Sequence, residues 1–178
     1  MGQRIVSLLA VILMCLAAHS SFSQAPNIYK GKEEKLPRAV EPQPLPFSHE
    51  QHAAKGMSCL VCHENAAKKE RAGLPDTAKC MICHETIATN SPAVEKLTQI
   101  HRQGDKVHWV RVYQVPDYVF FSHSLHVGAG QDCAACHGPV HQRQVLSQEV
   151  STSMIACMNC HAEKGASVEC HTCHELGQ

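Results

Sequence analysis

Five short cysteine–histidine motifs constrain this chain more than any other feature. Ten of its eleven cysteines form pairs three positions apart, and a histidine directly follows each pair. In chain order, motifs 1 to 5 are Cys59-Leu-Val-Cys62-His63, Cys80-Met-Ile-Cys83-His84, Cys133-Ala-Ala-Cys136-His137, Cys157-Met-Asn-Cys160-His161 and Cys170-His-Thr-Cys173-His174. Such regularity indicates one chemistry used five times.

Three chemistries use closely spaced cysteines. If the chain is exported, the first possibility is a disulfide framework. The second is a zinc ribbon, which fits the gap of seventeen residues between Cys62 and Cys80 and the gap of twenty between Cys136 and Cys157. Neither explains a histidine after every pair. C-x-x-C-H is the attachment signature of c-type haem, in which two thiols on one side of a helical turn bond the vinyl groups and the histidine binds iron. The sequence therefore predicts five covalently bound haem c, with the ten cysteines as attachment points and His63, His84, His137, His161 and His174 as proximal ligands.

Composition then predicts the fold class. Only 4% of the residues are aromatic, with four Phe, three Tyr and one Trp, so ordinary side chains supply little core volume. We expect a mostly irregular, haem-cored chain with short α-helices at the motifs and little β-structure. Without haem it is expected to be largely unfolded.

A second repeat supplies candidates for the sixth, distal iron ligand. Phe47-Ser48-His49-Glu50-Gln51-His52 precedes motif 1, and Phe121-Ser122-His123-Ser124-Leu125-His126 precedes motif 3. Histidines at i and i+3 share one helical face, and they are better suited to two nearby irons than to distant sites. The hypothesis assigns His49 to haem 1, His52 to haem 2, His123 to haem 3 and His126 to haem 4. Solvated surface histidines are the alternative.

The same repeat divides the chain. An apolar run from Ile5 to Ala18 after Arg4 reads as a signal peptide over residues 1–23, although an uncleaved membrane anchor is a second interpretation. A Pro-rich linker follows at 24–46. We then expect a two-haem module at 47–90, a connecting segment at 91–116 with a short helix over 91–104, and a three-haem module at 117–178. Ser151 to Met154 is expected to cap the helix that carries motif 4.

The Phe-x-His-x-x-His element leading into C-x-x-C-H is similar to class III multihaem cytochromes c. The stretch from Trp109 to Gly138 also resembles the pentahaem subunit of alternative complex III, a membrane complex that oxidises quinol. The first resemblance implies the same order of distal ligands as the hypothesis above. By analogy with three-haem members, it also points to Met154, just before motif 4, as the distal ligand of haem 5. His141, His108, His101 and His171 remain alternatives.

The number of candidate iron ligands indicates the function. Eight non-proximal histidines and Met154 exceed the five distal positions, which favours electron transfer over enzymatic activity. A multihaem reductase with one open-coordination haem is the alternative. The formal charge is zero, so haem propionates would make the holoprotein acidic. We expect redox protein partners with basic faces and no nucleic acid. The expected location is the periplasm, with a membrane quinol-oxidising complex or an uncleaved N-terminus as routes to the membrane.

Overall fold

The computed structural model describes residues 28–32 and 34–175, so the predicted signal peptide lies outside the described residues. The elements are short helices joined by irregular connections, in the order α2 (His49–Ala53), α3 (Cys59–Cys62), η1 (Glu64–Ala67), α4 (Thr77–His84), α5 (Pro92–Arg102), α6 (His123–Gly128), α7 (Ala134–His137), η2 (Val140–Gln142), α8 (Met154–Lys164) and α9 (Cys170–Cys173). In the part of the chain that is described, strand-like pairing is limited to one isolated bridge between Arg38 and Gln148. The predicted fold class of short helices with little β-structure is confirmed.

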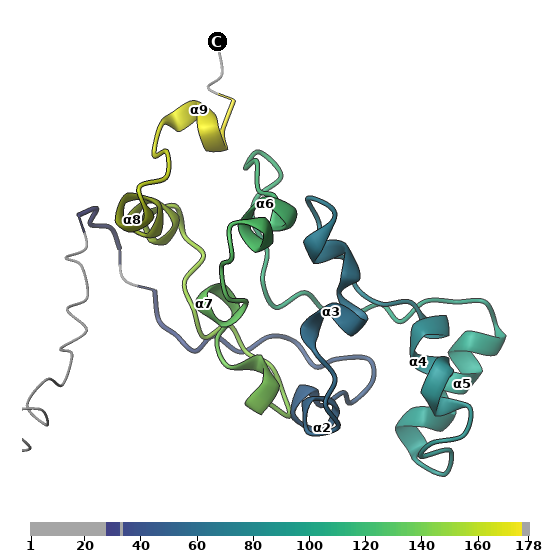
Figure 1. Cartoon of the computed structure of the whole chain (residues 1–178). Coiled ribbons are helices and arrows are strands. Elements are labelled where there is room, and N and C mark those ends of the chain that lie inside the picture. The colour runs from purple at the N-terminus through teal and green to yellow at the C-terminus, as the bar shows by residue number, and fades with distance from the viewer. Residues whose placement is uncertain (1–27, 33, 176–178) are drawn as a thin grey trace, which may run out of the picture.

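Each cysteine–histidine motif lies on a helical turn. Motifs 1, 3 and 5 lie on the four-residue helices α3, α7 and α9, whereas α4 and α8 carry motifs 2 and 4 within longer helices. Three residues of separation on a helix place both thiols of a pair on one side. In Figure 1 the motif helices follow one another across the molecule as α4, α3, α7, α8 and α9, from lower right to upper left.

Serine caps fix where the ligand helices begin. Ser48 accepts a hydrogen bond from the amide of Gln51 at the start of α2, and Ser122 accepts one from Leu125 at the start of α6. Ser153 caps α8 in the same way, as the sequence predicted. The predicted helix over 91–104 is α5, with Pro92 in its first turn. These caps satisfy amides that have no acceptor within their own helix.

The side-chain core is small. Among the described residues, the buried apolar side chains are Leu45, Ala66, Met81, Val94 and Leu97. No large side chain in this part of the chain is completely buried. Leu45, Met81 and Leu97 form one cluster, against which Ile100, Val107 and Trp109 pack. This cluster lies between α4 and α5, at the end of the molecule that carries motif 2. The chain around the other motifs has no comparable core of its own.

The segment before α2 runs along the molecule and contacts both halves. Tyr29 exchanges two hydrogen bonds with the Asn159 side chain on α8. The backbones of Arg38 and Gln148 exchange two hydrogen bonds of 2.8 Å, and the Gln148 side chain is buried. Farther along, the Gln43 amide bonds both backbone groups of Val110. The Pro-rich sequence is therefore held against the molecule over its described length (Figure 1).

No helix of the described residues is long and apolar enough to cross a membrane.

Candidate functional site

Three histidine pairs face one another at a separation that suits one iron. The ring centroids are 6.1 Å apart for His52 and His84, 6.3 Å for His123 and His137, and 6.1 Å for His126 and His161. Two imidazoles that bind one metal from opposite sides, each through a nitrogen at about 2.0 Å, have centroids roughly 6 Å apart. In each pair, one ring comes from the doubled Phe-Ser-His-x-x-His element and the other from a C-x-x-C-H motif. These are the pairings hypothesised for haems 2, 3 and 4.

His49 lies near His63, as the hypothesis for haem 1 requires. Burial, followed by the nearby His63 and His52, lowers the pKa of His49 to about 4. An imidazole with this pKa is neutral above about pH 4, which is the form that binds metal. Its Nδ1 atom is buried and has no hydrogen-bond partner.

Most candidate ligands have Nδ1 bonded to a backbone carbonyl. The pairs of histidine and carbonyl residue are His52 with Ser48, His63 with Gly73, His84 with Ile87, His123 with Glu70, His126 with Ser122, His161 with Ser167 and His174 with Tyr118, at 2.7 to 3.3 Å. A carbonyl can only accept, so Nδ1 carries the proton and Nε2 is left as the metal-binding atom. This is the arrangement expected of histidines that bind iron.

The two phenylalanines of the doubled element orient its histidines. Phe47 stacks on His52 at 4.4 Å and meets His49 edge-on at 4.8 Å. Phe121 lies 4.7 Å from His126 and meets His123 edge-on at 4.8 Å. Because each phenylalanine touches both histidines of its helix, it fixes their relative direction.

The cysteines fit haem attachment better than the alternatives. All ten motif cysteines are free thiols, and most are exposed. Across the described ranges, no group of three or more His, Cys, Asp or Glu side chains is placed to hold one metal ion among them. A zinc ribbon needs four ligands around one ion. Paired thiols beside an opposed histidine pair suit a covalently attached haem instead.

Cysteines of different motifs are also neighbours. Burial raises the pKa of the Cys80 thiol, and Cys62 raises it further. Burial is also the main cause of the raised pKa of Cys133, and the neighbouring Cys59 raises it further. The pKa of Cys136 is raised first by burial and then by the neighbouring Cys160. For Cys157, burial is again the main cause of a raised pKa, followed by Cys136, Cys173 and Cys160. The predicted attachment points of separate haems therefore lie close to each other.

The fifth motif lacks an opposing histidine in the part of the chain described here. His174 has the Tyr118 ring beside it, with centroids 5.9 Å apart. Met154 is the first residue of α8, one turn before Cys157, and is 60% exposed. Since Cys157 neighbours Cys173 of motif 5, Met154 lies in the region of haem 5, and its assignment stays a prediction.

The four alternative histidines have other contacts or are exposed. Nδ1 of His101 bonds the Thr77 hydroxyl at 3.1 Å. Nε2 of His141 contacts the Gln142 amide at 3.1 Å, and His108 is an exposed neighbour of Asp105. His171 is exposed on α9.

Tyr113 is a site residue that sequence reasoning missed. Its ring meets His137 edge-on at 4.7 Å, and its hydroxyl donates to the His137 carbonyl at 3.1 Å. The same hydroxyl accepts from the amides of Glu149 at 2.9 Å and Val150 at 3.3 Å. Tyr113 therefore connects His137, the predicted proximal ligand of haem 3, to the chain that leads into α8. Its place in an extended stretch gave no signal of this role.

Replacing Tyr113 with phenylalanine should keep the ring contact and lose all three hydrogen bonds. We expect the free energy of unfolding of the holoprotein to fall by about 1–3 kcal/mol, since two amides lose their acceptor. Denaturant titration followed by circular dichroism measures the change. Tyr118→Phe is the control because its side chain is 71% exposed. Equal stability of the two variants would show that the hydroxyl network has no such role.

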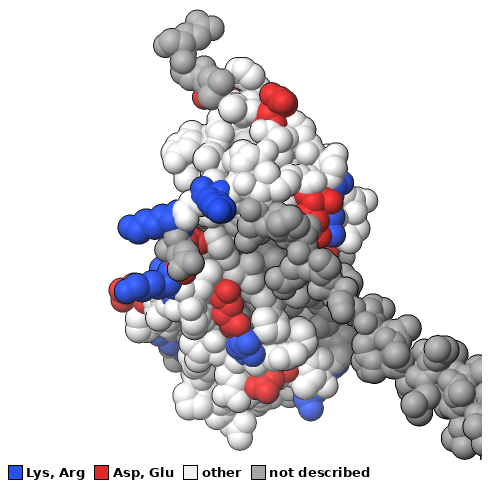
Figure 2. Space-filling view, turned by 90° about the vertical axis from the view of Figure 1, so that its left-hand side faces the viewer, with Lys and Arg blue, Asp and Glu red and all other residues white. Residues whose placement is uncertain are grey.

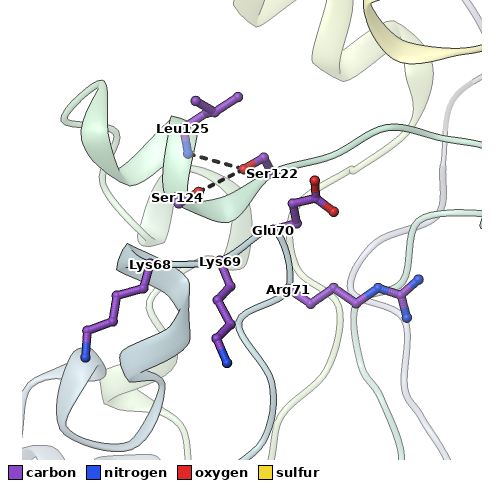
Figure 3. A pocket seen from close by; sticks show the side chains of 7 residues that line it. All are labelled: Lys68, Lys69, Glu70, Arg71, Ser122, Ser124 and Leu125. Carbon is purple, nitrogen blue, oxygen red and sulfur yellow. Dashed lines mark hydrogen bonds between the residues drawn. The ribbon is translucent and has the colours of Figure 1, made fainter.

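Charged side chains do not gather by sign on the one face that Figure 2 shows. On the face drawn in Figure 2, basic and acidic residues are interspersed among uncharged ones. A shallow pocket lies between the segment after η1 and the outer side of α6, and is lined by Lys68, Lys69, Glu70, Arg71, Ser122, Ser124 and Leu125 (Figure 3).

Two segments of the chain match known families. Residues 51–113 match the family model described as cytochrome c3, and residues 119–175 match the one described as cytochrome c7 and related cytochrome c. The first match contains motifs 1 and 2, and the second contains motifs 3 to 5. Both families are multihaem cytochromes that bind haem c covalently and carry electrons, which supports the class III resemblance. Neither match is to alternative complex III, and no curated protein matches the chain.

Proposed function

We propose that the chain is an exported pentahaem c-type cytochrome that transfers electrons and is not an enzyme. It acts either as a periplasmic carrier or as the electron-transfer subunit of a membrane quinol-oxidising complex. The opposed histidine pairs carry this proposal: three pairs 6.1 to 6.3 Å apart, each beside a cysteine pair. A bound haem c supplies an iron that alternates between ferric and ferrous states.

Histidines of the chain would bind that iron from both sides. A histidine on each side leaves no position for a substrate, so the iron can exchange electrons without binding small molecules. The carbonyl bonds to Nδ1 restrain each ring, and the phenylalanines restrain the distal pair further. Rigid ligands keep the coordination unchanged between the two oxidation states, which favours rapid transfer.

The location and partners are inferred from the sequence and from the matched families. The apolar run near the N-terminus supports export, and the two matched families are typically exported. The partners are redox proteins. The stretch from Trp109 to Gly138 supports a place in a quinol-oxidising complex, and association with the membrane would come through that complex or through an uncleaved N-terminus. Isolation of the protein from native membranes together with quinol-dependent haem reduction would test this setting.

One observation supports a second candidate function. Because no histidine ring lies opposite His174 among the described residues, haem 5 is the site at which an open position would occur. A reductase would use that position to bind its substrate.

A reductive titration followed by addition of CO, nitrite or sulfite distinguishes the two functions. We expect the oxidised holoprotein to accept about five electrons per chain, one for each iron, and the reduced protein not to bind CO. Steady consumption of nitrite or sulfite with CO binding at about one site per chain would favour the reductase. A capacity well below five electrons would contradict the haem count.

A further inference from the structure

The sequence repeat extends beyond the ligand element and keeps one spacing. Phe47 and Phe121 are 74 positions apart, and the same spacing relates Cys59 to Cys133 and His63 to His137. It also relates Gly56 to Gly130, both of which have a positive φ, of 80° and 73°. The segments 47–70 and 121–144 are therefore two copies of one unit, each with a ligand helix, a haem motif and the chain that follows it.

The two copies contact each other reciprocally. The amide of Glu50 on α2 donates to the carbonyl of Arg143 at 3.1 Å, and the amide of Ser124 on α6 donates to the carbonyl of Lys69 at 3.1 Å. Glu50 and Ser124 are counterparts at the spacing of 74, and so are Lys69 and Arg143. Each ligand helix is thus bonded to the chain that follows the other copy's motif. Such an exchange is what a two-fold axis produces.

Packing follows the same rule. Helix α2 packs against η2, which follows motif 3, and α6 packs against η1, which follows motif 1. Figure 3 shows the segment from Lys68 to Arg71 running beside α6. The counterpart side chains Cys59 and Cys133 are close enough to interact. The symmetry is incomplete, because the amide and Nδ1 of His123 both bond the Glu70 carbonyl, whereas Nδ1 of His49 has no partner among the described residues.

We propose that motifs 1 and 3 form the centre of the haem chain, related by an internal pseudo-twofold axis, and that the haems are connected in the order 2, 1, 3, 4, 5. The inference rests on the proposed function and adds the route. His49 and His52 on α2 join haems 1 and 2, and His123 and His126 on α6 join haems 3 and 4.

Motif 5 completes the order at the other end. The Phe120 amide bonds the Cys173 carbonyl at 2.8 Å, and His174 bonds the Tyr118 carbonyl, so α9 is held to the chain that enters α6. The Ser167 carbonyl, between motifs 4 and 5, accepts from His161. Haems 2 and 5 are therefore the two ends of the route, and the helices that carry their motifs, α4 and α9, lie far apart in the molecule (Figure 1).

Nuclear Overhauser contacts between haem protons in the fully reduced holoprotein test this order. Low-spin ferrous haems are diamagnetic, and each haem is assigned through contacts with its own cysteines and axial histidines. We expect inter-haem contacts for the pairs 1–2, 1–3, 3–4 and 4–5. Absence of the 1–3 contact, or a contact of haem 2 with haem 3, 4 or 5, would overturn the order. The contacts 1–2, 1–3 and 3–4 can be read even if haem 5 is five-coordinate, and therefore high-spin and paramagnetic when reduced, so the order of haems 1 to 4 can fail while the proposed function stands.

Ser124→Pro tests the reciprocal bonds. Proline at this position removes the amide that donates to Lys69, and in the first turn of α6 that amide has no acceptor within the helix. We expect the 1–3 contact to weaken while the 1–2 contact persists. Ser124→Ala keeps the amide and is the control, with unchanged contacts expected. An unchanged 1–3 contact in the proline variant would overturn the role of the bond. If that variant fails to bind five haems, the contacts of the unaltered protein decide the order.

Discussion

A variant in which alanine replaces all ten motif cysteines is expected to lose its cooperative unfolding transition. The buried apolar side chains of the described residues are few, and they lie mainly between α4 and α5. Each contributes about 1.5–3 kcal/mol when fully buried, whereas ordering the backbone costs about 1–2 kcal/mol for every residue. Short helices such as α3, α7 and α9 do not persist alone. Circular dichroism during a thermal ramp would show a gradual, shallow change.

A variant with fewer cysteine replacements provides the control for this prediction. Replacing only Cys170 and Cys173 removes the attachment points of the terminal motif and leaves the four other motifs in place. That variant should still unfold cooperatively, at a lower temperature than the unaltered holoprotein. A sharp transition in the variant without any motif cysteine would show that the polypeptide forms a core by itself.

Removing His123, the proposed distal ligand of haem 3, should leave one iron with a free coordination position and the others with both axial ligands. His123→Gly deletes one ring of the pair with 6.3 Å between centroids and nearly parallel planes. We expect the oxidised variant to show a high-spin EPR signal from about one haem per chain, and the reduced variant to bind about one CO. Added imidazole should occupy the empty position and restore the low-spin signal.

Leu125→Gly is the matched control for this ligand variant. Leu125 lies on the same helix, is 73% exposed and faces away from the histidines. It imposes the same glycine cost on α6, roughly 1 kcal/mol, without removing a ligand. High-spin haem in both variants would mean that loss of the helix opens the iron, and not loss of His123.

The helices and the histidine pairing follow from local patterns in the sequence. The period of Val94, Leu97 and Ile100 and the proline at position 92 specify α5, and Ser153 specifies the start of α8. The i, i+3 spacing of His49 and His52 predicts that each binds a different haem, and the structure places the His52 ring 6.1 Å from that of His84. These are interactions within a few residues, or repeats of one chemical unit.

Contacts between distant segments could not be derived in this way. Leu45 lies in a Pro-rich stretch that the sequence marked as a linker, yet it is 4% exposed and belongs to the main apolar cluster. The carbonyls that bond Nδ1 of the ligands come from residues as different as Gly73 and Glu70, because every residue has a carbonyl. Backbone acceptors leave no trace in residue identity, so only the fold reveals them.

The central claim is that five haems are covalently attached and that each iron has two axial ligands. An EPR-monitored redox titration of mature holoprotein, combined with its intact mass, tests this most directly. We expect a mass equal to the polypeptide plus five haems, low-spin ferric signals that disappear on reduction, and no high-spin component. A mass with fewer than five haems, or a high-spin signal from about one haem per chain in the unaltered protein, would contradict it.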